Sequence, residues 1–176
     1  LNEPHNFFHR VAMNTLHITA LTALVALGST TALAQGVRTE KALSLDLANQ
    51  IASATVSACS ANGHAVTATV VDRAGNVRAM QRADNAGPHT LEASRLKAYT
   101  SASARNTTLA MMEAAQKNPA AANLKDIPGF LLLGGGVPVR AGTEVIGAVG
   151  VGGAPGGHLD EQCAMAALEQ VKAALQ

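Results

Sequence analysis

The feature that most constrains the fold is a stretch between residues 130 and 160, in which two glycine-rich segments follow apolar runs. The triplet Gly134, Gly135 and Gly136 comes directly after the run Phe130–Leu133. A second segment, residues 152–157, ends the apolar run before it. Glycine permits backbone angles closed to other residues and lets another group approach the main chain closely. The two segments therefore indicate either a binding site or a very tight junction between sheet and helix.

The core has to be built from small aliphatic side chains. Of the 176 residues, 48% are hydrophobic, but only 2% are aromatic and none is Trp. A formal net charge of +1 gives no electrostatic reason to expect nucleic acid or an anionic membrane surface as a partner. The shortage of aromatic rings argues in the same direction, because single-stranded nucleic-acid sites usually stack bases on them.

Residues 1–34 are predicted to be a leader and a secretory signal peptide. An apolar, uncharged stretch follows Met13 and ends in a small-x-small cleavage pattern at Ala34. Its apolar centre is shorter than the ~20 residues of a spanning helix, and a buried or anchoring helix is the alternative. We expect a signal peptide from about Met13 to Ala34 and a mature chain, residues 35–176, that forms one domain in the periplasm or outside the cell.

Two cysteines, Cys59 and Cys163, belong to the predicted mature chain. An exported protein can form disulfides, and an even count permits one. A lone cysteine on a helix is otherwise usually a small buried hydrophobe. The sequence leaves both interpretations open.

Hydrophobic periodicity predicts a mixed α+β domain. In the first predicted strand, Val66 and Val70 alternate with Thr67 and Thr69, which places the two kinds of side chain on opposite faces. Short gaps between strands favour antiparallel pairing, so we expect a five-stranded antiparallel sheet with helices packed on it. The predicted helices are residues 44–61, 91–105, a short one ending near 116, and 159–175, and the predicted strands are residues 64–72, 76–82, 130–133, 137–140 and 144–151.

Several catalytic and cofactor motifs are absent from the sequence. The glycine-rich segments match neither a dinucleotide loop nor a P-loop, and there is no Gly-x-Ser-x-Gly or Cys-x-x-Cys pattern. His64, His89 and His158 lack the close spacing of a dedicated zinc site. No pair of carboxylates stands out for acid–base chemistry.

The candidate site lies around the start of the predicted helix at residue 91. His89 and Thr90 precede it, where unpaired backbone N–H groups attract anions, and Arg82 ends the preceding strand. Lys97 follows on the same helix, in a stripe that we interpret as a solvated face and that also contains Thr90, Ser94 and Ser101. A soft donor beside cationic groups would suit a flat apolar ligand with carboxylates. The alternative is that His89 and Thr90 merely cap the helix.

Seven blocks of sequence resemble the GlcG/HbpS family. They lie, in order, at residues 70–76, 82–90, 97–100, 134–139, 146–151, 153–157 and 160–164. Together they span nearly the whole mature chain and keep the family's spacing. The resemblance implies a three-layer α/β/α, profilin-like fold that often assembles into homo-oligomers.

The same resemblance implies haem as the ligand. Better-understood members of the family bind haem, and some promote haem degradation or sense redox state. We therefore expect an exported haem-binding protein that acts as a carrier, store or sensor. The alternatives are an enzyme that degrades haem or acts on another small metabolite, and a structural oligomer that has no small-molecule ligand.

By analogy with the family, haem contacts are expected between His89 and Lys97. His89 would bind the iron, or Thr90 would act as a weak oxygen donor, while Arg82 and Lys97 would pair with the propionates. Ser94 and the triplet Gly134, Gly135 and Gly136 complete the expected cofactor site. Gly152 stands where Ser is common in the family, which leaves the role of its loop open.

Overall fold

The structure is a computed structural model that describes residues 36–176. The predicted signal peptide lies outside the described residues. The chain divides into two units, residues 1–39 and 40–176, and the second contains all the helices and strands described. In this part of the chain, no helix combines the length and the apolar character that crossing a membrane requires.

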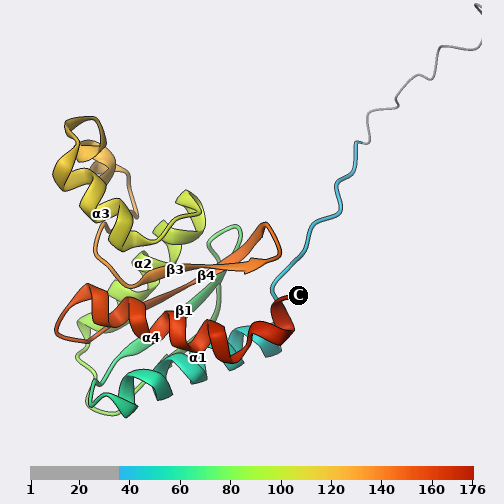
Figure 1. Cartoon of the computed structure of the whole chain (residues 1–176), viewed down its shortest axis with the longest axis horizontal. Helices are drawn as coiled ribbons and strands as arrows, with labels where there is room; N and C mark the ends of the chain where they lie inside the picture. Colours follow the sequence, from blue (N-terminus) through green and yellow to red (C-terminus); the bar gives the residue numbers. More distant parts are fainter. Residues whose placement is uncertain (1–35) are drawn as a thin grey trace, which may run out of the picture. The chain divides into compact units, whose positions relative to one another are not determined.

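The second unit is a mixed α+β fold built on one antiparallel sheet (Figure 1). The strands are ordered β2-β1-β4-β3, which places β1 and β4 in the middle of the sheet. The first and the last elements of this unit are helices. The elements are α1 (Leu45–Ala61), β1 (Thr67–Asp72), β2 (Val77–Arg82), α2 (His89–Ala104), α3 (Thr108–Lys117), η1 (Pro119–Asp126), β3 (Gly136–Ala141), β4 (Glu144–Gly152), α4 (Gly157–Gln170) and η2 (Lys172–Leu175).

Local sequence signals set the ends of two helices. The hydroxyl of Ser44 accepts a hydrogen bond from the backbone N–H of Leu47, which confirms the predicted cap of α1. At the other end of α1, the backbone N–H of Asn62 donates to the carbonyl of Cys59. The hydroxyl of Thr107 caps α3 in the same way, by accepting from the N–H of Ala110.

Helices cover both faces of the sheet, as Figure 1 shows. Val66 and Val70 of the first strand segment pack in the larger core with α1 and α4. On the opposite face, Val71 packs with Ala98 of α2. The predicted alternation along β1 is confirmed, and it explains why the strand is buried on both sides.

The sheet has four strands among the described residues, so the prediction of five was wrong. The run Phe130–Leu133 is not a strand, because side chains rather than a neighbouring strand satisfy its backbone. The N–H of Leu131 donates to the hydroxyl of Thr100, and the carbonyl of Leu133 accepts from the hydroxyl of Thr108. Its apolar side chains therefore pack near α2 and α3 without joining the ladder.

A disulfide between Cys59 and Cys163 joins α1 to α4. The two Cα atoms lie 5.3 Å apart although the residues are 104 positions apart in the sequence. Of the two interpretations that the sequence left open, the structure has the bridge. A covalent link across so long a loop restricts the unfolded chain and holds the two helices together on one face of the sheet.

The contact between α2 and β4 is unusually close because β4 has glycine where it meets the helix. A Cβ atom added to Gly150 would lie 2.1 Å from the carbonyl oxygen of Ser94 and 2.4 Å from the nitrogen of Ala98. Neither backbone atom can move without shifting the helix. At Gly152, by contrast, the nearest atom would be 3.4 Å away, an ordinary contact.

This difference predicts opposite outcomes for two matched substitutions. Gly150→Ala should lower the free energy of unfolding by at least ~1–3 kcal/mol, since the added methyl group forces α2 away from the sheet. Gly152→Ala should change the free energy of unfolding by much less. Denaturant unfolding of the two variants measures both values, and equal losses would contradict the packing described here.

Candidate functional site

The polar stripe of α2 faces the sheet and is buried, so its interpretation as a solvated face was wrong. Thr90, Ser94 and Lys97 are all almost completely inaccessible to solvent. The hydroxyls of Thr90 and Thr67 are 2.7 Å apart, and those of Ser94 and Thr69 are also 2.7 Å apart. Because β1 presents threonines on this face, polar side chains of the helix find partners there.

Lys97 forms a buried ion pair with Asp160 at the start of α4. The Nζ atom of Lys97 lies 2.8 Å from Oδ2 of Asp160 and donates a second hydrogen bond, also 2.8 Å, to the carbonyl of Val151. The other carboxylate oxygen, Oδ1, accepts from the N–H of Ala154. Burial raises the pKa of Asp160, although the adjacent ammonium favours the ionised carboxylate.

The central glycine of the triplet, Gly135, packs directly on this ion pair. Gly134, Gly135 and Gly136 are buried, and a Cβ atom at Gly135 would lie 2.7 Å from Cβ of Asp160. Gly135 also has a φ of +121°, a conformation that side chains disfavour. The sequence left two interpretations of the triplet, a binding site or a tight junction between sheet and helix. Its position in the structure is that of a tight junction.

Arg82 and His89, the other two predicted site residues, lie at the surface on either side of the loop 83–88. The guanidinium of Arg82 donates to the carbonyl of Ala86. The ring of His89 lies against Gly87. The helix α2 begins at His89, and Thr90 is not its cap, because its hydroxyl donates to the carbonyl of Gly87.

The residues of the predicted site therefore lie in two separate groups, one in the interior and one at the surface. The structure brings Lys97 and the glycine triplet together inside the protein, with Thr90 and Ser94 on the same buried face. Lys97, expected to pair with a propionate, pairs with Asp160 instead. Sequence reasoning placed Asp160 only in the first turn of a helix, where it is favoured by the dipole. No signal in the spacing could have joined residues 63 positions apart.

The ion pair predicts a strongly non-additive pair of substitutions. Lys97→Met should lower the free energy of unfolding by ~3–5 kcal/mol, because it leaves the charge of Asp160 buried without a partner. Lys97→Met combined with Asp160→Asn should be less destabilised than Lys97→Met alone, since the amide is neutral and keeps the oxygen that accepts from Ala154.

Denaturant unfolding of the wild type, the two single variants and the double variant forms a complete thermodynamic cycle. A double variant at least as unstable as the sum of the singles would contradict a compensating pair.

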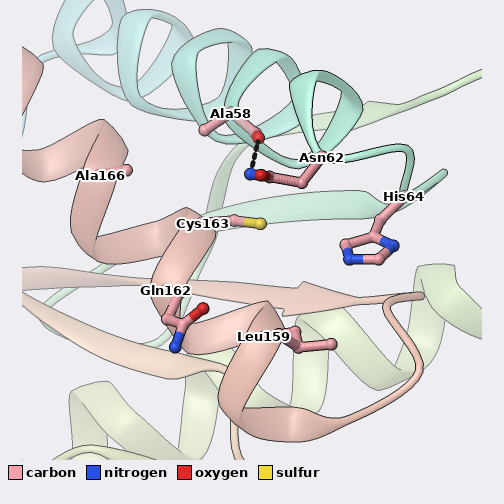
Figure 2. Close-up of a pocket in the computed structure, with 7 residues that line it drawn as sticks. All are labelled: Ala58, Asn62, His64, Leu159, Gln162, Cys163 and Ala166. Carbon is pink, nitrogen blue, oxygen red and sulfur yellow. Dashed lines mark hydrogen bonds between the residues drawn. The ribbon is translucent and has the colours of Figure 1, made fainter.

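One cavity lies between the end of α1 and the start of α4, and we call it the His64 cavity (Figure 2). Its volume is about 380 Å³. Figure 2 shows the His64 ring, Leu159 and Cys163 around the same space. Imidazole, amide and apolar side chains thus meet in one place, and no Asp, Glu, Lys or Arg is among the lining residues. The lining residues are Ala58, Asn62, His64, Leu159, Gln162, Cys163 and Ala166.

A second cavity of about 430 Å³ lies between α3, η1 and the segment 130–132, and we call it the Met112 cavity. Apolar side chains make up most of its wall, including Met112 and Phe130. Lys125 is the one cation among its lining residues, and its ammonium lies 2.9 Å from a carboxylate oxygen of Asp126. A thioether, apolar walls and a single positive charge would suit an amphipathic anion.

Neither cavity is a metal centre built from protein ligands alone. Among residues 36–176, no group of three or more His, Cys, Asp or Glu side chains could hold a metal ion.

Comparisons of the sequence and the fold with known proteins agree on one family. A family model described as haem degrading protein HbpS-like matches residues 43–169. A crystal structure of a double mutant of Streptomyces reticuli HbpS is 36% identical, with a TM-score of 0.73, covering 83% of this chain and 98% of the other.

Two further relatives have similar identity. The crystal structure of the Klebsiella pneumoniae protein ORFY is 31% identical with a TM-score of 0.75, and the match covers 80% of this chain and 98% of that one. An uncharacterised 15.0 kDa protein from the dhaT–dhaS intergenic region of Citrobacter freundii is 34% identical over 122 residues, which are 62% of this chain and 86% of the relative.

Proposed function

Because the chain belongs to the family of HbpS-like, haem-degrading proteins, we propose that it binds haem. The observation that carries this proposal is the extent of the family match, which spans residues 43–169 and so includes the residues of the His64 cavity and the Met112 cavity. The role proposed is that of a carrier, store or sensor of haem. Assembly into a homo-oligomer is part of the same proposal.

The side chains present fit such a ligand. Haem needs apolar surface for the macrocycle and a donor atom for the iron, which histidine, methionine, cysteine or tyrosine commonly provides. The His64 cavity offers an imidazole beside amide and apolar side chains, and the Met112 cavity offers apolar walls and a thioether with Lys125 for a propionate.

The site expected from the sequence fits less well. His89 and Arg82 are accessible, and a surface site at these two residues stays a prediction. Lys97 could reach a propionate only by leaving Asp160 with an uncompensated charge in the interior. Thr90 and Ser94 would likewise have to give up hydrogen bonds to the sheet.

Oxidative degradation of haem is the second candidate function, and the description of the family favours it. It requires a reductant and oxygen in addition to bound haem. Binding without turnover would leave the absorbance of the complex stable under those conditions, whereas degradation would remove it.

Titration with haemin tests the proposal directly. The folded protein should shift the Soret band and saturate at a fixed stoichiometry per chain, because one ordered site determines the iron's environment. The same protein, unfolded in denaturant after reduction, serves as the control. A Soret band indistinguishable from that of haemin in buffer would refute haem binding, and loss of the band with ascorbate and oxygen would identify degradation.

Export completes the proposal, and the disulfide supports it, since such bonds persist mainly in oxidising compartments. Protein recovered from its native cells should therefore begin near Gln35 and contain no thiol that reacts under denaturing conditions. N-terminal sequencing and a thiol assay measure the two properties. An intact leader together with two free thiols would contradict export.

A further inference from the structure

The two sulfurs of the disulfide differ in their access to solvent. Cys59, near the end of α1, has no accessible surface, whereas Cys163 of α4 keeps 4% of its surface and lines the His64 cavity. Figure 2 shows the sulfur of Cys163 directed toward the space beside Asn62 and His64. A small molecule that enters the cavity therefore meets the sulfur of Cys163 before it meets that of Cys59.

We propose that the His64 cavity is a site of thiol–disulfide exchange. A low-molecular-weight thiol of amino-acid or short-peptide type enters it and forms a mixed disulfide with Cys163. This modification goes beyond haem binding and does not depend on it.

The exchange balances without any further reagent. The incoming thiol loses its proton, and its thiolate attacks Sγ of Cys163. A bond forms between these two sulfurs while the bond from Cys163 to Cys59 breaks, and Cys59 leaves as a thiolate that takes up a proton. A second thiol molecule can then attack the mixed disulfide. That step reduces the protein and releases the small molecule as its own oxidised disulfide.

The size and the lining of the cavity suit a small polar thiol. Its volume of about 380 Å³ is near the lower end of the range of ligand pockets. The imidazole of His64 and the amide of Gln162 can donate hydrogen bonds to a carboxylate, while Leu159 offers apolar contact to a methylene group. Because no Asp or Glu is among the lining residues, the lining itself does not repel an incoming thiolate.

Other contacts keep the walls of the cavity in place when the disulfide opens. The carbonyl of Cys59 accepts hydrogen bonds from the N–H groups of Asn62 and His64, each at 3.0 Å. The start of α4 is held through Asp160, which pairs with Lys97. Cleavage of the disulfide leaves these contacts intact. Cys59 therefore stays near the mixed disulfide and can close the original bond again, which makes the modification reversible.

The alternative is a disulfide that reacts only when the contact between α1 and α4 opens. Local opening would expose both sulfurs together, and the reaction rate would follow the population of the open form. Exchange through the cavity instead selects Cys163 and proceeds in the native state. The two routes thus differ in which sulfur reacts and in how denaturant affects the rate.

Single-cysteine variants measure each sulfur separately. Cys59→Ser leaves the thiol of Cys163 at the cavity, and Cys163→Ser leaves the thiol of Cys59 in the interior; both lose the same covalent link. With oxidised glutathione under native conditions, Cys59→Ser should form a mixed disulfide at least about tenfold faster than Cys163→Ser, because exchange depends on access. Mass spectrometry follows the added glutathione. The rates in denaturant, where both thiols are accessible, provide the reference.

A second pair of variants tests the cavity itself in the Cys59→Ser background. Ala166→Phe places a large side chain on the lining and should slow the reaction with oxidised glutathione. Met165→Phe adds bulk one position away, on an exposed part of α4 outside the lining residues, and should leave the rate unchanged. Circular dichroism confirms that each variant is folded.

The wild type tests the same assignment with both cysteines present. Excess reduced glutathione should reduce its disulfide at a rate that low, non-denaturing urea leaves unchanged, and the first mixed disulfide, trapped with acid, should map to Cys163. A rate that rises with urea, a mixed disulfide on Cys59, or equal native rates for the two single-cysteine variants would overturn the site. None of these measurements uses haemin, so their outcome is independent of haem binding.

Discussion

The buried ion pair between Lys97 and Asp160 connects all three layers of the protein. Lys97 belongs to α2, Asp160 belongs to α4, and the Nζ atom also binds the carbonyl of Val151 in the central strand β4. Two charges removed from water must meet in good geometry, with their remaining hydrogen bonds satisfied. The pair therefore ties α2 and α4 to the central strand β4.

The close geometry that this ion pair requires explains why glycine and small polar residues surround it. For the side chain of Lys97 to pass the C-terminal end of β4 and reach α4, the backbones have to come close. Glycine at Gly135 and Gly150 removes the side chains that would hold them apart. The hydroxyl pairs of α2 and β1 extend the polar layer along the helix. The low content of bulky aromatic residues is consistent with this close packing.

The His64 cavity lies where this rigid frame ends. The disulfide joins α1 to α4 beside the cavity, because Cys163 is one of the lining residues. Side chains at such a junction are positioned by both helices without being fully enclosed, which is a common location for ligand sites. The Met112 cavity has a different setting, because α3 and η1 carry it beside the segment 130–132.

The sequence by itself determined the elements whose signals are local. The cap at Ser44, the alternation along β1 and the antiparallel hairpin of β1 and β2 follow from adjacent residues, and the structure confirms them. The sequence also indicated the family, because the blocks that resemble it occur along the chain in the family's order. The family match over residues 43–169 bears this out.

Only the tertiary structure decided which polar residues face outward. A stripe of Thr, Ser and Lys on a helix has the same spacing whether it meets water or a sheet, and the partners of Thr90 and Lys97 lie far away in sequence. The run Phe130–Leu133 is likewise apolar enough for a strand, but hydroxyls from α2 and α3 satisfy its backbone. His64 became a candidate only when folding placed α4 beside it, because a cavity is a property of several segments and no single segment encodes it.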